Sequence, residues 1–432
     1  MLQKIKKVLL QTFIFLLPIQ TVYIVQDNFL NAEKWQYGTS VFYVTEMLMW
    51  FSVIFFIIDY FVLFKKKLIQ RDAGWSKEKL FSVSILFFLL YLLFNTFFVA
   101  QNFQVAWQMT RWWMLSFLFF IILTSGFLKI KSILWPVVLG SILPSVLGIW
   151  QFLMQQTFAS KFFGLALHSP EVSGVSVIAS DSIGRWLRAY GTFGNPNMFG
   201  GYLVLVIIFT FLLMKRVEVK KQKVFLMILL FVQTMALFFT FSRSAWIAWF
   251  LFAFFISIYC FIVNKKVAWP IIFSLIFFAI LSLLFFNLLQ NRIEVKSRYE
   301  VRSISERVTG YREALEIWDN HKFLGVGSGN YTLASFDLDK RQVGTSYQPV
   351  HNIFLLFIVE NGIIGFAFFS FILATFFIYY LSIVGNKKVL FSLVLAIIFL
   401  ILGLFDHYLL SSYIGLMIFA LYLAVISRLS TD

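Results

Sequence analysis

Long stretches of apolar residues, separated by short polar segments, dominate the pattern of this chain. A helix needs about 20 apolar residues to cross a bilayer, so each such stretch predicts a membrane-spanning helix. The pattern predicts an all-α polytopic membrane protein in which residues 1–432 form one integral-membrane domain. The twelve predicted spans lie at about residues 8–25, 41–64, 80–99, 112–128, 132–152, 199–214, 224–240, 245–263, 269–289, 352–380, 389–405 and 411–427.

Two of the predicted loops are too long to be simple turns. Residues 153–198 are rich in Gly, Ser, Asn and Pro, and residues 290–350 contain a predicted helix of their own. Ser303-x-x-Glu306 has the form of a capping box, and apolar residues recur at helical spacing from there on. We therefore expect an amphipathic helix along the membrane surface, followed by a tight loop in the glycine-rich residues 325–330. The recurring apolar residues are Ile304, Val308, Tyr311, Leu315 and Trp318.

The composition agrees with this fold class and limits the possible partners. The chain is 60% hydrophobic and 13% charged, its mean hydropathy is +0.85, and its single cysteine, Cys260, excludes a disulfide framework. The net charge of +16 could indicate a nucleic-acid partner, but the positive-inside rule explains it better. With the N-terminus in the cytoplasm, 21 of the 36 basic residues fall in cytoplasmic segments. We therefore expect both termini in the cytoplasm, both long loops on the outer side, and no nucleic-acid partner.

His351 is the first candidate for chemistry, because it opens the tenth predicted span. On a continuous helix, Gly362 and Gly365 would lie on the face that carries His351, whereas Glu360 would lie on the opposite face. A histidine at a helix start is often only a hydrogen-bonded interface residue. Histidine also titrates near neutral pH, which suits it to act as a general base. If His351 is a base, the group that orients it must come from another segment.

Four arginines are predicted at the same outer level as His351. An arginine at the end of a span is costly unless it is paired, and some of these side chains can simply extend their charge into the interface. For Arg243, a functional role and a charge that merely extends into the interface are equally favoured. For Arg312 a solvated position is favoured, and for Arg307 a functional role is favoured. Guanidinium groups bind phosphate oxygens and stay charged, so the group indicates an anionic ligand such as a lipid diphosphate. The four arginines are Arg188, Arg243, Arg307 and Arg312.

The sequence shows no pattern typical of a metal or nucleotide site. Acidic residues on the outer side lack a D-x-D or paired spacing, and no His/Cys cluster occurs along the chain. The segment that begins Gly325-Val-Gly-Ser-Gly follows no βαβ unit, so nucleotide binding is not expected. We therefore expect no metal and no cofactor. Among the other histidines, His321 is a secondary candidate, whereas His168 and His407 lie in a variable loop and a short turn.

Four motifs follow one another between about residues 188 and 366. They are Arg188-x-x-Gly-Thr-Phe-Gly-Asn-Pro-Asn197, Ser242-Arg243-Ser-Ala-Trp246, Arg307 with Gly325-Val-Gly after it, and His351-Asn352-x9-Gly362-x-x-Gly365. In this order they resemble the motifs of the O-antigen ligase and polymerase superfamily, a group of membrane glycosyltransferases that use polyprenyl-diphosphate-linked glycans. The histidine motif is closest to the ligase type.

The resemblance implies an inverting, metal-independent glycosyltransferase in the cytoplasmic membrane, with its active site facing the periplasm or cell exterior. It would move a glycan from undecaprenyl diphosphate to an acceptor hydroxyl, on a lipid A core or a similar lipid or glycan acceptor. Arg188, Arg243 and Arg307 would hold the diphosphate, and His351 would deprotonate or orient the acceptor hydroxyl. Arg307 and His351 are thus the expected catalytic residues. The remaining expected substrate-binding residues are Arg312, Asn195, Asn197 and Asn352.

Alternative functions stay open. A polymerase of the same superfamily would extend the glycan on its lipid carrier, and a protein O-oligosaccharyltransferase would modify a protein. Outside this class, a transporter of lipid-linked glycans would need polar groups at mid-membrane and broken helices. Glu46, Asp59 and Glu360 are the candidates for such groups, and they are too scattered to form an ion path.

Overall fold

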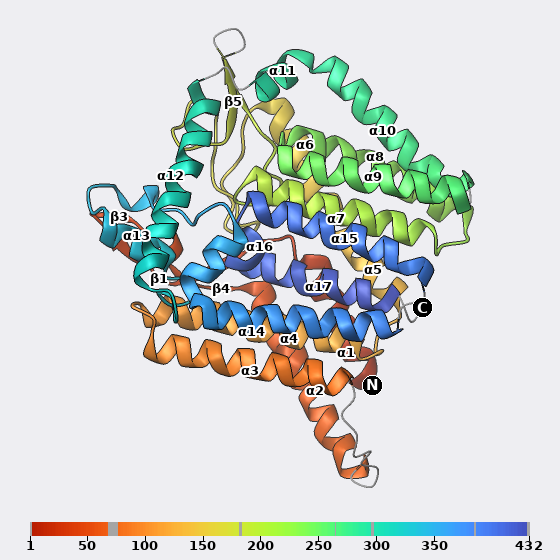
Figure 1. Ribbon diagram of the computed structural model, residues 1–432. Coiled ribbons are helices and arrows are strands. Elements are labelled where there is room, and N and C mark those ends of the chain that lie inside the picture. The colour runs from red at the N-terminus through yellow and green to blue at the C-terminus, as the bar shows by residue number, and fades with distance from the viewer. Residues whose placement is uncertain are drawn as a thin grey trace.

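Each predicted span overlaps a helix in the computed structural model of the protein (Figure 1). The structure describes residues 2–67, 77–180, 184–263, 265–294, 298–383 and 386–429. Most of these residues are helical, which confirms the helical fold class. The helices that overlap the spans are α1 (Leu2–Leu16), α2 (Val44–Lys67), α3 (Lys77–Phe98), α4 (Phe103–Thr124), α5 (Ile130–Gly140), α6 (Ile142–Met154), α7 (Pro196–Met214), α8 (Lys220–Phe239), α9 (Arg243–Val263), α10 (Lys265–Leu284), α14 (Ile353–Ile383), α15 (Asn386–Phe405) and α17 (Tyr413–Leu429).

Length and apolar character identify membrane-spanning candidates among these helices. Within the described residues, six helical segments are long and apolar enough to cross a bilayer, with α5 and α6 counted together. A seventh candidate is α10 with α11 (Phe286–Glu294), two helices that meet at 89°. Four further apolar helices are shorter. The protein is thus a helical membrane protein, and twelve crossings stay a prediction.

Helix α7 forms the centre of the bundle. Its residues from Met198 to Leu213 are all buried, because the sequence is apolar on every side of the helix. It contacts α5, α8, α9 and α17. The first turn of α7 is therefore held firmly in place by the surrounding helices.

Three two-stranded sheets depart from the all-α prediction. The first predicted span reached residue 25, but α1 ends at Leu16 and strand β1 (Val22–Gln26) follows. Pro18 lacks a backbone donor, and Val, Tyr and Ile favour strands, so this segment leaves the helix. Strand β1 pairs with β4 (Ser40–Tyr43) in antiparallel register. The other two pairs are β2 (Phe29–Leu30) with β3 (Glu33–Lys34), and β5 (Val177–Ser180) with β6 (Gly184–Leu187).

Helix α12 (Arg298–Asn320) confirms a helix in the second long loop, but it begins earlier than predicted. Ser303 lies inside the helix, so the sequence Ser303-x-x-Glu306 does not cap its start; the side chain of Ser303 lies outside the described residues. In Figure 1, α12 crosses the bundle helices near their ends, and α13 (Tyr331–Leu338) lies beside it, far from both chain termini. Ala314 and Ile317 are buried, whereas Leu315 is exposed. The helix is thus apolar on both an inner and an outer side.

Helix α14 is broken, so the predicted face shared by His351 and the two glycines is wrong. Gly362 has φ 63° and ψ −177°, which interrupts the helix at that residue. Beyond the break, the N–H of Ile363 donates to the carbonyl of Lys322 at 2.8 Å. Because the two halves of α14 do not share one helical register, Gly365 cannot be placed from His351 by counting residues.

The glycine-rich loop fills the break in α14. The N–H groups of Val326 and Gly327 donate to the carbonyls of Val359 and Glu360 at 3.1 and 2.9 Å. Backbone groups freed by a break in a membrane helix must find such partners, because no water is present to replace them. Positive φ values at the three glycines of the loop confirm the predicted tight turn. These glycines are Gly325, Gly327 and Gly329.

Replacing Gly327 with alanine should destabilise the protein. Gly327 has φ 102°, and an added Cβ would lie 2.5 Å from the Cα of Ala100. We expect strain and overlap to cost roughly 2–4 kcal/mol, seen as a lower midpoint of thermal unfolding in detergent. Gly184→Ala is the matched control, because Gly184 has φ 69° but no neighbour within 4 Å of the added Cβ. Equal unfolding midpoints for Gly327→Ala and Gly184→Ala would contradict the expectation that overlap with Ala100 destabilises the protein.

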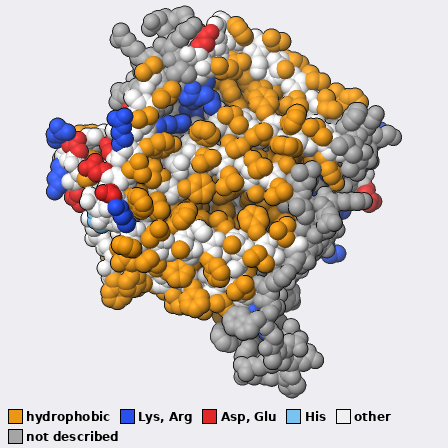
Figure 2. Space-filling view, viewed as in Figure 1, with side chains coloured by type: hydrophobic (Ala, Val, Ile, Leu, Met, Phe, Trp, Pro, Cys, Tyr) orange, Lys and Arg blue, Asp and Glu red, His pale blue; other side chains and the backbone are white. Residues whose placement is uncertain are grey.

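The surface agrees with a membrane setting. Figure 2 shows hydrophobic side chains covering the face of the helical bundle, while charged side chains gather over the α12 and α13 region. Large apolar residues such as Phe51, Phe87 and Ile228 are more than half exposed, at 59%, 52% and 59%. Such a surface is stable only in contact with lipid or another apolar layer.

Candidate active site

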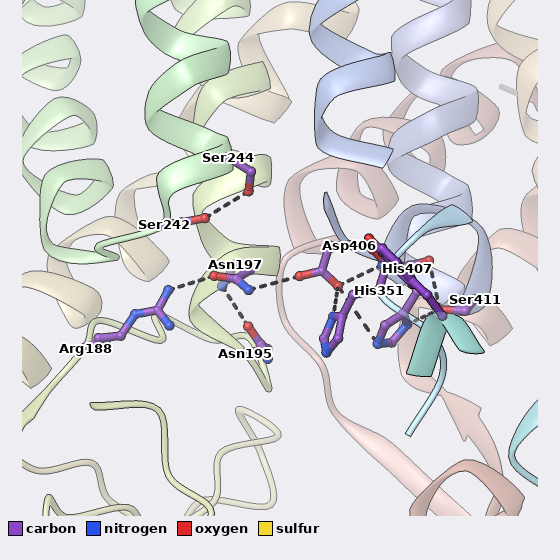
Figure 3. A network of polar contacts seen from close by, with 10 residues as sticks. Arg188, Asn195, Asn197, Ser242, Ser244, His351, Asp406, His407 and Ser411 are labelled. Carbon is purple, nitrogen blue, oxygen red and sulfur yellow. Dashed lines mark hydrogen bonds and ion pairs between the residues drawn. The ribbon is translucent and has the colours of Figure 1, made fainter. Parts of the chain in front are cut away.

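Four side chains from four separate segments form one chain of hydrogen bonds (Figure 3). The Nδ1 of His351 lies 3.4 Å from Oδ1 of Asp406. The other carboxylate oxygen, Oδ2, accepts from Nδ2 of Asn197 at 3.0 Å, and Oδ1 of Asn197 accepts from Nη2 of Arg188 at 2.7 Å. Three residues predicted from the sequence are thus brought together around Asp406, which the sequence did not single out.

The first turns of two helices hold Asn197 and His351 in position. Asn195 caps α7, its Oδ1 accepting from the N–H of Asn197 at 2.7 Å, and Pro196 occupies the first helical position. Asn352 caps α14 by accepting from the N–H groups two and three residues further on, at 3.0 and 3.1 Å. His351 directly precedes this cap. The oxygens of Asn195 and Asn352 therefore have structural roles, and their contact with substrate stays a prediction.

Asp406 is buried and keeps its negative charge. Burial acts to raise its pKa, but the hydrogen bond from His351 and the charges of His351 and His407 hold the pKa well below its usual range. The N–H of His407 also donates to Oδ1, at 2.8 Å. Because a carboxylate can only accept, the neutral His351 ring carries its proton on Nδ1 and keeps a free lone pair on Nε2. Asp406 is thus the orienting group for His351.

His407 lies beside His351, although the sequence pattern placed it only in a short turn. The two ring centroids are 5.4 Å apart, and Nδ1 of His407 lies 2.7 Å from Oγ of Ser411. Burial lowers the pKa of His407 to about 4, although the charge of Asp406 opposes this shift, so the ring is neutral at neutral pH. Among the described residues, His351, Asp406 and His407 offer potential metal ligands within 4.8 Å of one another. The structure thus brings together in space a group that no cluster pattern along the chain indicated.

A group of arginines surrounds the turn between α8 and α9. Arg188 Nε donates to the carbonyl of Thr240 at 2.7 Å, and Arg292 Nε donates to the carbonyl of Phe241 at 3.0 Å. Arg243 begins α9, and its Nη1 donates to the carbonyl of Arg292 at 3.4 Å. Phe241 has φ 46°, which is unusual for a residue with a side chain and marks a constrained turn. Three cations therefore approach one turn, and Arg188 connects them to Asp406.

Arg292 is a site candidate that the sequence did not reveal. It is only 8% exposed. The ninth span was predicted to end at about residue 289, whereas α10 and α11 meet at 89° and Arg292 of α11 contacts the α8–α9 turn through the carbonyl of Phe241. A buried arginine in a membrane protein is costly and often functional, but its burial could not be foreseen without the bend.

A comparison with known families finds one match. The model of the family described as O-antigen ligase matches residues 225–370. This part of the chain is therefore similar to an O-antigen ligase domain. The match supports the resemblance drawn from the four motifs, and it suggests a glycosyltransferase-like enzyme of the ligase or polymerase type. No curated protein matches the chain.

The O-antigen ligase match contains only part of the hydrogen-bonded site. The matched region, 225–370, extends from α8 into α14, and it includes Arg243, Arg292 and His351. Arg188 precedes it and Asp406 follows it. The chain of hydrogen bonds from Arg188 to His351 is therefore completed by residues on both sides of the matched region.

The two arginines predicted on helix α12 differ in exposure. Arg307 is half-buried and Arg312 is exposed. One turn beyond Arg307, the hydroxyl of Tyr311 donates to the carbonyl of His351 at 3.4 Å, so this side of α12 faces the histidine segment. Arg307 lies on that side, whereas Arg312 is turned away by about 140° from Arg307. The geometry therefore favours Arg307 for a role beside His351 and a solvated position for Arg312.

Proposed function

We propose that the protein transfers a glycan from undecaprenyl diphosphate to an acceptor hydroxyl, in the manner of an O-antigen ligase. The observation that carries this proposal is the polar chain from Arg188 through Asn197 and Asp406 to His351. It connects a group suited to hold an anion with a group suited to accept a proton. Transfer from a lipid diphosphate to an alcohol requires both.

His351 acts as the general base in this proposal. Its Nε2 accepts the proton of the acceptor hydroxyl while the hydroxyl oxygen attacks the anomeric carbon of the donor. The bond between that carbon and the diphosphate oxygen breaks, and the electron pair leaves with the diphosphate. The attack comes from the side opposite the leaving group, so the configuration inverts. Asp406 stabilises the imidazolium that forms, as the carboxylate does in a hydrolase triad.

The arginines stabilise the leaving diphosphate. Negative charge grows on the bridging oxygen as the anomeric bond breaks, and fixed guanidinium groups favour this charge more than the ground state. Arg188, Arg243 and Arg292 surround the α8–α9 turn, and Arg307 approaches from α12. No step in this scheme requires a metal ion or cofactor.

The site faces away from the cytoplasm in this proposal. The distribution of basic residues favours cytoplasmic termini, and Figure 1 draws both termini at the end of the bundle far from α12 and α13. The donor would therefore be presented on the outer leaflet of the cytoplasmic membrane, with the acceptor in the periplasm or at the cell exterior.

Purified protein in liposomes tests the function directly. The donor is a polyprenyl-diphosphate glycan, offered alone or with a separate acceptor such as a lipid A core. We expect transfer to the added acceptor with release of polyprenyl diphosphate. Growth of the glycan on its own carrier would instead establish the polymerase, and no transfer under either condition would reject a glycosyltransferase using this donor.

Removal of divalent metals should leave transfer intact. Acid–base chemistry and charge stabilisation come from side chains in the proposed scheme, so EDTA should change the rate by less than about twofold, far below the effect of losing a general base. The rate is measured by following lipid-linked glycan consumption before and after chelation. Loss of activity that magnesium restores would contradict the metal-independent mechanism.

A further inference from the structure

The cluster of His351, Asp406 and His407 has a second chemical capacity besides proton transfer. Oδ1 of Asp406 lies 3.4 Å from Nδ1 of His351 and 3.9 Å from Nε2 of His407, and the ligand atoms are all within 4.8 Å of one another. Adjacent ligands of tetrahedral zinc are about 3.3 Å apart when each bond is about 2.05 Å long. The three side chains therefore need only small movements to bind one ion.

The hydrogen bonds of Ser411 fix which nitrogen of His407 is free. The hydroxyl of Ser411 donates its only proton to the carbonyl of His407 at 3.0 Å. Its oxygen can then only accept from Nδ1 of His407, which lies 2.7 Å away. Nε2 of His407 is consequently left with a lone pair directed at the cluster. A carboxylate oxygen and this lone pair face each other without a proton between them, which is an arrangement that a cation stabilises.

The kind of ion follows from the ligands. Two imidazole nitrogens and one carboxylate oxygen suit zinc and similar transition metals, whereas magnesium prefers six oxygen ligands. Ser411 supports His407 from the second nitrogen, as partners of metal-binding histidines usually do. The side chain of His351 is 26% exposed, so an ion can enter from that side and keep a water molecule as its fourth ligand.

We propose that His351, Asp406 and His407 form an inhibitory zinc site at the catalytic base. To bind zinc through Nδ1, the neutral His351 ring must move its proton to Nε2. That nitrogen then has no lone pair to accept a proton from the acceptor hydroxyl, and zinc also takes the Asp406 oxygen that orients the ring. Zinc and glycan transfer therefore exclude each other. The inhibition rests on the proposed function of His351, whereas the binding of zinc does not.

The test compares wild-type protein with His407→Gln in the liposome transfer assay over a range of zinc chloride concentrations. Glutamine can keep a hydrogen bond to Ser411 but supplies no imidazole ligand. We expect zinc to inhibit the wild type, EDTA to reverse the inhibition, and magnesium chloride to have no effect. In His407→Gln we expect at least about tenfold weaker inhibition, with the rate of each protein expressed relative to its own rate without zinc. Both samples receive the same donor, so binding of zinc to its diphosphate affects them equally.

Calorimetry with zinc chloride keeps the binding and functional parts separate. Full-length wild-type protein in detergent should bind one zinc ion, and His407→Gln should bind it at least about tenfold more weakly. If His407→Gln fails to fold, Ser411→Ala, which releases the Nδ1 constraint, should weaken zinc binding in the same direction. Equal zinc affinity in the wild type and the folded variant would overturn the proposal. If the wild type binds zinc but transfers no glycan, the zinc site is supported and the proposed function is rejected instead.

Discussion

Replacing His351 with glutamine should reduce glycan transfer by about 10³-fold while the protein remains folded in the membrane. Glutamine can still donate a hydrogen bond to Asp406, but it cannot accept the proton of the acceptor hydroxyl. The side chain of His351 is 26% exposed and lies outside the helical core, so the fold should tolerate the change. The measurement is the transfer rate of purified variant in liposomes at saturating donor and acceptor.

Asp406→Asn separates orientation from proton transfer. Asparagine keeps the size of the side chain but can present its amide NH₂ to His351, which then favours the tautomer with the proton on the wrong nitrogen. We expect a strong fall in kcat with little change in donor KM. Normal transfer by His351→Gln would remove the base assignment, and normal transfer by Asp406→Asn would remove the orienting role.

Replacing Arg243 with glutamine should lower kcat/KM for the donor by about 10²-fold. The loss of one fixed cation at the α8–α9 turn removes charge stabilisation of the leaving diphosphate. Arg243→Lys should recover only part of the activity, because an ammonium group cannot bind two phosphate oxygens with a planar fork. Arg292→Gln should have a similar effect, because Arg292 contacts the same turn. Donor concentration is varied at fixed acceptor to separate kcat from KM.

Arg341→Gln is the matched control for these variants. It removes the same charge from the second long loop, and its side chain is 90% exposed beside Asp339. We expect unchanged kinetics for the control. An equal fall in kcat/KM for the donor in Arg243→Gln and Arg341→Gln would mean that net charge, rather than a diphosphate site, governs the reaction. Unchanged donor kinetics in Arg243→Gln would exclude Arg243 from the donor site.

The sequence predicts the helices well because long apolar runs have few stable alternatives in a bilayer. The strands and bends were not predictable in the same way. Residues 22–26 continue an apolar run, and only Pro18 and the β-branched composition distinguish them from helix. The break at Gly362 depends on hydrogen bonds from a loop more than 30 residues away, and no local pattern reveals such a partner.

The candidate site was predictable only in part. His351, Arg188 and Asn197 stand in recognisable motifs, and the structure brings them together. Asp406 and His407 lie in a short polar break between two apolar runs, where an acidic residue could have been noted as costly and therefore functional. The pairing of Asp406 with His351 depends on tertiary packing across 55 positions, which a single sequence does not encode locally.

The amide of Asn197 has a consequence for how the site holds its charges. It separates the guanidinium of Arg188 from the carboxylate of Asp406, bonding to one through oxygen and to the other through nitrogen. A direct ion pair between Arg188 and Asp406 would neutralise both groups before any substrate arrived. With a neutral amide between them, the proposed mechanism can use the cation for the diphosphate and the anion for the histidine. In the proposed reaction, one uncharged residue thus separates two opposite charges that act on different groups, the leaving diphosphate and the histidine base.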